Sequence, residues 1–187
     1  MHEDAWRDKA TLEAGLGEVC QSPRNDGTLE WIVRRPETGE REPVSEGELD
    51  TRLGLVGDNW LARGNHQTAD GAADPNAQLT IMNSRAVALL AGEQERWALA
   101  GDQLYADMDL SVENLPPGTR LTIGEAVVEV TAAPHLGCRR FAERYGKDAV
   151  RFVNSPDGKR LRLRGLNAKV VTPGAIRVGD QVVKQLP

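Results

Sequence analysis

Short apolar runs separated by glycine and proline make up the second half of the chain, and this pattern most constrains the fold. Residues 120–123 and 126–130 alternate polar and apolar side chains around Gly124-Glu125, which predicts a tight hairpin. The 19 Gly and 10 Pro suit many short strands. Further strands are predicted at 149–153, 161–164, 168–171, 175–177 and 181–185. We therefore expect a mainly β fold, an antiparallel barrel or sandwich.

Three segments are predicted to be helical. An N-terminal helix is expected at 5–19, since Ala5, Leu12, Leu16 and Val19 share one stripe. A short helix at 84–90 follows a buried strand at 79–82, and Ser84 is expected to cap it. A further short helix after Pro134 places three side chains on one side: Phe141, Ala142 and Tyr145.

The 187 residues are enough for one domain with a short appendage. Residues 28–35 are predicted to form a strand ended by Pro36, and a polar stretch follows to residue 50. Residues 57–78 are rich in Gly, Asp and Asn and are predicted to be mostly a long loop, either functional or simply a surface loop. We expect residues 1–50 to supply a helix and strand that pack on a domain formed by residues 51–187.

Charge is distributed unevenly along the chain. The formal net charge is −5, which argues against a general nucleic-acid binder. Residues 134–187 carry 12 basic and 4 acidic side chains, a net charge of +8, which leaves −13 on residues 1–133. Such a split is typical of a solvated face, and it also occurs where an anion binds.

Other features bear on location. No apolar run approaches the roughly 20 residues of a membrane span, so no membrane partner is expected. The first residues lack a basic-then-apolar leader, and two cysteines are too few for a disulfide scaffold. We expect a cytoplasmic protein with reduced thiols.

Cys138 is the residue most suggestive of chemistry. It lies between a predicted strand and a predicted helix, next to Arg139 and Arg140 and three residues after His135. A position at a helix start beside cations favours the thiolate, which is both nucleophile and soft metal ligand. An inert buried cysteine is the competing interpretation. His135 could serve as a base, a ligand or a phosphate donor, or be purely structural. Cys20, at a helix end, is interpreted as structural.

Several known site motifs are missing from the sequence. There is no CxxC or HxxxH zinc spacing, no phosphate-binding P-loop, no GxGxxG fingerprint and no GxSxG nucleophile elbow. These classes are therefore not expected.

The sequence resembles the MOSC domain family, named for the C-terminal part of molybdenum-cofactor sulfurase. Its most specific element is PHLGC at residues 134–138, which resembles the family's Pro-x-x-x-Cys. The other elements that resemble the family pattern are GLVGD at 54–58, GDQL at 101–104, IGEA at 123–126, GLNAKV at 165–170 and PGAIRVGD at 173–180. The chain departs from that pattern at His66-Gln67-Thr68, where many relatives have His-Gly-Gly, at Gln103, where the family has Asn, and at Asn167, where it has Tyr.

The resemblance implies a MOSC-type β-barrel with a few short helices and a site at the cysteine. In active relatives this cysteine ligates the molybdenum of a pterin cofactor or is proposed to carry sulfur. Cys138 would then be the metal ligand and, with His135, a candidate catalytic residue. Residues expected to bind the cofactor are Arg139, Arg140, Arg151, Asn83, Ser84 and Arg85. No pyridoxal phosphate is expected, since the pyridoxal-phosphate domain of the full-length sulfurase is missing.

Three functions remain open at this point. The first is molybdenum-cofactor binding through Cys138 with reduction of small N-hydroxylated or N-oxide-type molecules, which requires an electron-donating partner protein. The second is a sulfur or cofactor carrier with a persulfide on Cys138. The third is a binding module without cofactor, which predicts a buried Cys138 with no pocket beside it.

Overall fold

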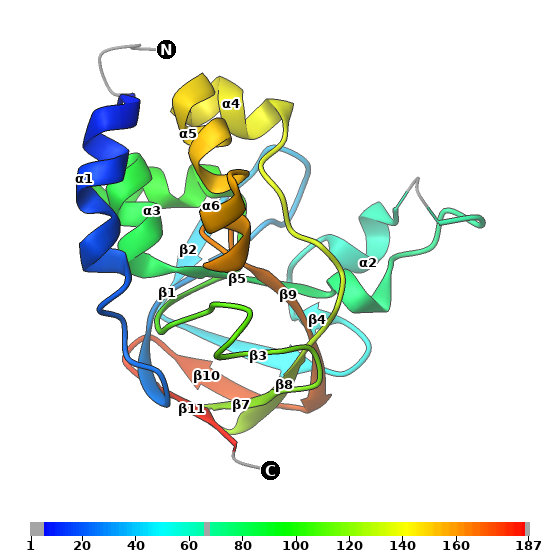
Figure 1. The fold of residues 1–187 in the computed structure, drawn as a ribbon. Helices are drawn as coiled ribbons and strands as arrows, with labels where there is room; N and C mark the ends of the chain where they lie inside the picture. Colours follow the sequence, from blue (N-terminus) through cyan, green and yellow to red (C-terminus); the bar gives the residue numbers. More distant parts are fainter. Residues whose placement is uncertain (1–5, 66–67, 186–187) are drawn as a thin grey trace.

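A closed β-barrel forms the centre of the molecule (Figure 1). The computed structural model describes residues 6–65 and 68–185. Within them, seven strands follow one another around the barrel in the order β11-β7-β8-β9-β5-β6-β1, and pairing of β1 with β11 closes it. The barrel strands are β1 (Asp26–Arg34), β5 (Leu79–Asn83), β6 (Leu104–Asp107), β7 (Arg120–Ile123), β8 (Ala126–Val130), β9 (Leu166–Thr172) and β11 (Gln181–Lys184).

Smaller strands extend the barrel at its edges. β2 (Glu42–Val44) pairs with β1, and a separate sheet joins β10 (Gly174–Arg177), β3 (Glu46–Asp50) and β4 (Gly54–Leu55). The pairs around the barrel are antiparallel, except that β5 and β6 run parallel with Ile81 opposite Leu104. The parallel pair brings the residues that precede β6 to the same end of the sheet as the first residues of β5.

Helices cover the outer face of β1, β5 and β6. They are α1 (Lys9–Val19), α3 (Ser84–Ala91), the 3₁₀ helix η3 (Gln94–Ala100), α4 (Arg139–Tyr145), α5 (Lys147–Val153) and α6 (Pro156–Arg160). A short helix α2 (Trp60–Arg63) and a 3₁₀ turn η2 (Pro75–Ala77) lie on another side, in the segment before β5.

The strands under the helices are buried on both faces. Along β6, Leu104 and Ala106 point into the barrel core, whereas Tyr105 belongs to the second core beneath the helices. Leu12 of α1 and Phe141 of α4 complete that second core. Apolar burial on both faces makes this wall a rigid base for the residues that lie at its end.

Most predicted elements are confirmed, including the hairpin, the strand at 79–82 and the helices at the amino terminus, at 84 and after Pro134. Ala5, at the start of the first predicted helix, lies outside the described residues. The mainly β fold class, a barrel with short helices and an N-terminal helix, is also confirmed. The cap of α3 is Asn83 rather than Ser84, because the Asn83 side chain accepts the hydrogen bond from the Ala86 amide.

Two predicted strands are wrong. Residues 149–153 lie in helix α5, and residues 161–164 form turns. In α5, Ala149 and Val153 are four residues apart and both enter the helical core, a spacing that also fits an alternating strand. The stretch between residues 36 and 50, expected to be polar, contains β2 and β3, whose residues are exposed or half-buried except for the buried Leu49.

The barrel and the smaller sheet both contain strands from each side of residue 50. β1 is part of the closed barrel, and β3 pairs with β10 from the far end of the chain. Among the described residues, no helix has the length and apolar character needed to cross a membrane.

Candidate functional site

The segment from Thr131 to Cys138 contains His135 and Cys138, the two residues predicted from the sequence to be candidate catalytic residues. It leaves β8, runs between α6 on one side and α2 on the other, and ends at the start of α4 (Figure 1). Side chains of the surrounding structure hold its backbone. Asn167 of β9 donates hydrogen bonds to the carbonyls of Ala133 and Pro134, each at 3.2 Å.

The residue before the cysteine is held most tightly. Asn154 donates to the carbonyl of Gly137 at 2.8 Å and accepts from its amide at 2.9 Å. A Cβ at Gly137 would lie 2.8 Å from Cγ2 of Val153, so a side chain has no room there. The glycine therefore allows the chain to lie against α5 one residue before the thiol.

His135 belongs to a buried network of charged groups. Its Nε2 lies 2.8 Å from Oδ1 of Asp102, which is completely buried. The other carboxylate oxygen of Asp102 accepts from Arg164, which also donates to the carbonyl of Ala100 at 2.9 Å. The Arg164 guanidinium stacks on Phe141, with 4.9 Å between its carbon and the ring centroid. This network connects residues 131–138 to the start of β6 and to the turn before β9.

Charges within this network set the protonation of its members. Burial by itself would raise the pKa of Asp102, but Arg164 and His135 outweigh it and hold that pKa well below its usual range. Burial and then the charge of Arg164 lower the pKa of His135, although Asp102 opposes the shift. His135 is therefore a neutral imidazole near pH 7, and Asp102 is a carboxylate that accepts from it.

Cys138 is exposed and lies at the cap position of α4, a helix of seven residues. Its side chain makes no hydrogen bond to the described residues. Arg139 extends into solvent with a side chain that is 93% exposed and pairs with Glu143 on its own helix. The thiol is thus accessible, while the adjacent arginine is turned outward. Cys20, expected to be structural, is a second exposed thiol at the end of α1.

Arg140, two residues after the thiol, lines a cavity of about 370 Å³ that we call the Arg63 cavity. Arg63 and Arg140 have no hydrogen bond or ion pair from their side chains to other described residues. Burial, with repulsion from Arg35 and Arg140, lowers the pKa of Arg63. The lining residues are Trp60, Arg63, Gly64, Asn65, Asp74, Ala77 and Arg140.

The remaining predicted cofactor-binding residues lie elsewhere. Asn83 and Ser84 are buried at the far end of β5, where Asn83 caps α3. Arg85 forms ion pairs with Asp107 and Glu18. Arg151 pairs with Asp148 on α5, beside α1. The structure therefore brings Arg140 to Arg63, with Cys138 two residues before Arg140 and outside the cavity lining, and it leaves these four residues apart from that cavity.

A match to a family profile adds independent information. The profile of the MOSC domain matches residues 66–183, well over half of the chain. The chain belongs to the MOSC domain family. This family is associated with the molybdenum cofactor. No functionally curated protein matches the sequence at significant similarity.

Solved structures support the MOSC fold. The YuaD protein of Bacillus subtilis superposes with a TM-score of 0.65 at 17% identity, covering 87% of this chain and 97% of that one. YiiM of Escherichia coli gives a TM-score of 0.55 at 18% identity, covering 86% of this chain and 70% of that one. YiiM of Geobacillus stearothermophilus gives 0.56 at 15% identity, with 86% and 75% covered. At these identities the likeness concerns the fold.

At two positions where this MOSC domain departs from the family pattern, the side chain present forms hydrogen bonds within the structure. The amide oxygen of Gln103 accepts from the backbone and hydroxyl of Thr80, and its nitrogen reaches the Gln78 carbonyl at 3.3 Å. Asn167 supports residues 133 and 134 as described above. At the third position, His66 and Gln67 lie outside the described residues, and Thr68 bonds to the carbonyl of Asn65.

Sequence reasoning missed several residues that shape this site. Asp102 stood inside the GDQL element without a role, and Arg164 was one of many cations in the positive segment. Arg63 was hidden in the predicted loop. A buried aspartate is found from sequence only when its partners are known, and these lie 33 and 62 residues away. The local pattern therefore carries little signal for them.

Proposed function

We propose that this MOSC domain binds molybdenum cofactor, with the Cys138 thiolate as its protein ligand to the metal. The observation that carries the proposal is an exposed, unpaired thiol two residues from an arginine that lines the Arg63 cavity. Thiolate is a soft donor suited to such a metal. No group of three or more His, Cys, Asp or Glu side chains that could hold a metal occurs among the described residues. In this proposal Cys138 is the ligand that the chain supplies, and the other ligands belong to the cofactor.

The Arg63 cavity fits the phosphate end of the cofactor. Arg63 and Arg140 repel each other there, and a phosphate between them would turn the repulsion into two attractions. Asp74 is the acidic residue of the lining, and its carboxylate already accepts from the Asn76 amide. Among the residues predicted from sequence to bind the cofactor, Arg140 is the one supported by this geometry.

Chemically, the bound molybdenum centre would supply removal of oxygen from small N-hydroxylated or N-oxide-type substrates. Electrons would come from a partner protein. The chain's own residues hold the thiol in place, because Asn154 fixes Gly137 and the network of His135, Asp102 and Arg164 fixes the segment before it. In this proposal His135 positions the segment rather than contacting the metal.

Molybdenum content is the direct test. Wild-type protein and the Cys138→Ser, Arg63→Gln and Arg140→Gln variants would be produced in a host that makes the cofactor, and molybdenum per protein measured by mass spectrometry. We expect loss in Cys138→Ser and reduction in both arginine variants. Cys20→Ser, at the other exposed cysteine, is the matched control and should retain wild-type content. Equal molybdenum in wild type and Cys138→Ser would refute the proposal.

A sulfur-carrier function is the second candidate, favoured by the exposure of the thiol and by its position outside the lining of both neighbouring cavities. It predicts that incubation with a persulfide donor transfers one sulfane sulfur atom to the Cys138 thiolate, the donor leaving as its thiol, and that a reductant reverses this mass gain in intact mass spectra. A gain that persists in Cys138→Ser would assign the sulfur to another residue. The third function, a cofactor-free binding module, predicted a buried cysteine, and Cys138 is exposed.

A further inference from the structure

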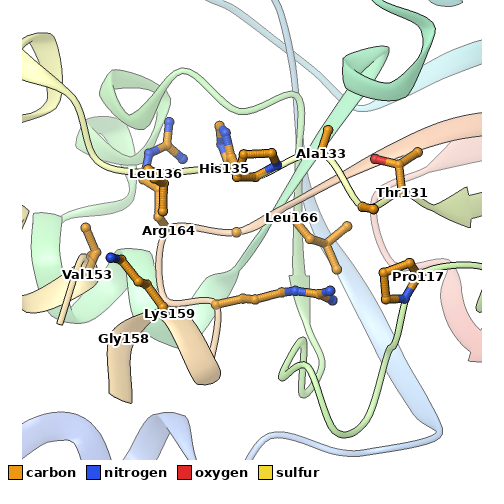
Figure 2. A pocket seen from close by; sticks show the side chains of 14 residues that line it. Pro117, Thr131, Ala133, His135, Leu136, Val153, Gly158, Lys159, Arg164 and Leu166 are labelled. Carbon is orange, nitrogen blue, oxygen red and sulfur yellow. The ribbon is translucent and has the colours of Figure 1, made fainter. Parts of the chain in front are cut away.

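A second cavity opens on the other side of residues 131–138, towards α6 and β9 (Figure 2). Its volume is about 370 Å³, in the range of small-molecule sites. We call it the His135 cavity. Four apolar side chains form much of its wall: Pro117, Leu136, Val153 and Leu166. These residues come from four separate segments of the chain, so the cavity is a product of the tertiary fold.

Cations line this cavity and carboxylates do not. Lys159, Arg162 and Arg164 take part in its lining, and no Asp or Glu does so among the described residues. The charge of Arg164 is already matched by Asp102. Lys159 forms no ion pair or side-chain hydrogen bond with the described residues. Glu113, which lies outside the lining, partly offsets the charge of Arg162. The cavity therefore has positive charge that is only partly compensated by the described residues.

Arg162 is fixed in position and forms no ion pair with a described residue, although the charge of Glu113 acts on it. Its guanidinium donates to the carbonyls of Leu115 at 2.7 Å and of Leu110 at 3.4 Å, and burial lowers its pKa. Its backbone φ is +49°, the left-handed region, which no other non-glycine residue adopts among those described. A strained backbone of this kind is maintained by its surroundings and is enriched at binding sites.

His135 adds a polar group to the same cavity. Its Nε2 is occupied by Asp102, whereas its Nδ1 has no hydrogen-bond partner among the described residues. Because the Nε2 hydrogen is directed at the carboxylate, Nδ1 offers a lone pair. Figure 2 places His135 and Arg164 on one side of the cavity and Lys159 and Pro117 at different points around it. A ligand could thus meet cations, an acceptor and apolar walls together.

We propose that the His135 cavity is a separate binding site for a small organic anion, whose carboxylate or phosphate is attracted by the cations that line it, Arg162 and Lys159. The apolar body of the ligand packs on Pro117, Leu136 and Leu166. A hydroxyl or N–H group of the ligand donates to Nδ1 of His135. The site lies across residues 131–138 from the Arg63 cavity and does not depend on the cofactor proposal.

Binding of defined probes to cofactor-free protein tests the site. The probes are benzoate, its three monohydroxy isomers and phenyl phosphate, with neutral benzyl alcohol for comparison, followed by calorimetry and amide chemical shifts. We expect saturable binding of the anions, with shifts at Leu136 and residues 159–166. Benzyl alcohol should bind about tenfold more weakly or less, since it lacks the charge. Comparing benzoate with phenyl phosphate decides between carboxylate and phosphate.

Two variants probe the cations. Arg162→Gly removes the charge and suits the positive φ, so it should fold while weakening anion binding about tenfold. Lys159→Gln changes an exposed side chain and should weaken binding by less, about threefold. Arg177→Ala is the matched control, because Arg177 is an exposed cation that pairs with Glu46 and does not line the cavity, and it should leave binding within about twofold.

Several results would overturn the proposal. They are no saturable binding of any anion at about 10 mM, unchanged affinity in both Arg162→Gly and Lys159→Gln, or shifts confined to the Arg63 cavity. A fall in molybdenum content caused by Arg162→Gly would also overturn it, because the cavity would then belong to the cofactor site. Failure of the cofactor proposal, with no molybdenum in wild type, leaves these binding results unaffected.

Discussion

The two cavities that flank residues 131–138 have similar volumes but different electrostatics. In the His135 cavity, backbone carbonyls hold Arg162, and the neighbouring Arg164 is matched by Asp102. In the Arg63 cavity, Arg63 and Arg140 come from two short helices and repel each other. A cation held in place by backbone carbonyl dipoles keeps its charge available to a bound anion. Two neighbouring cations that repel each other are stabilised most by a doubly charged anion that binds between them.

Apolar walls extend this contrast. The His135 cavity is bounded by Pro117, Leu136, Val153 and Leu166, so it can take the body of an organic ligand. The Arg63 cavity has Trp60 and Ala77 as its apolar side chains and is otherwise polar or glycine. The first cavity suits an amphipathic molecule and the second suits a phosphate group. The predictions below alter the wall between the two cavities or one side of it.

Asp102→Asn should have the largest effect. The variant leaves Arg164 buried without a countercharge, which costs about 3–5 kcal/mol of the free energy of unfolding. The His135 cavity should also be perturbed, because an asparagine side chain offers one acceptor oxygen where Asp102 offers two, to His135 and to Arg164. Urea denaturation measures the change, with Asp157→Asn, a largely exposed partner of Arg160, as control. A loss below about 1 kcal/mol would mean that the network contributes little to the wall.

Asn154→Ala should have the next largest effect. It removes both hydrogen bonds to Gly137, leaving two partly buried backbone groups unpaired, at a cost of about 1–3 kcal/mol. Hydrogen exchange at the Gly137 amide should accelerate, since the segment before Cys138 loses its anchor. Asn25→Ala, at an exposed position, is the control. Unchanged exchange at Gly137 would contradict the role given to Asn154.

Arg63→Gln should act on one cavity alone. Removing one of two repelling cations should change stability by less than about 1 kcal/mol, towards greater stability, since the repulsion between Arg63 and Arg140 is lost while a polar side chain remains. Added inorganic phosphate should raise the melting temperature of wild type more than that of the variant. Equal shifts in both proteins would show that phosphate does not use Arg63.

The smallest effect is expected for the contribution of His135 to the pH dependence of the free energy of unfolding. Its pKa is lowered in the folded protein, so the free energy of unfolding should be unaffected well above pH 6.5 and should fall as the pH drops below it. In that range the unfolded chain takes up a proton that the folded chain resists. The wild-type slope should exceed that of His135→Gln, measured by denaturation between pH 5 and pH 8. Identical slopes would mean that His135 does not resist protonation.

Much of the fold could be predicted from the chain. The hairpin at 120–130 carried both alternation and a turn signal, and the PHLGC element marked the cysteine. The errors arose where one local pattern fits two structures. Residues 149–153 form a short, mostly apolar run that was predicted to be a strand, yet they form α5, because Ala149 and Val153 gain burial against the helical core.

The site residues also divide into those that are neighbours in the sequence and those that only the fold brings together. Cys138 and Arg140 lie in one short segment, so the sequence alone determined that a thiol and a cation are neighbours. Asp102, His135 and Arg164 are distant along the chain, and Arg63 lies in a stretch without regular pattern. Only the tertiary structure decided which cations are neutralised and which remain free. The reason is physical: the cost of burying a charge depends on which partner the fold brings to it, and that partner is not encoded locally.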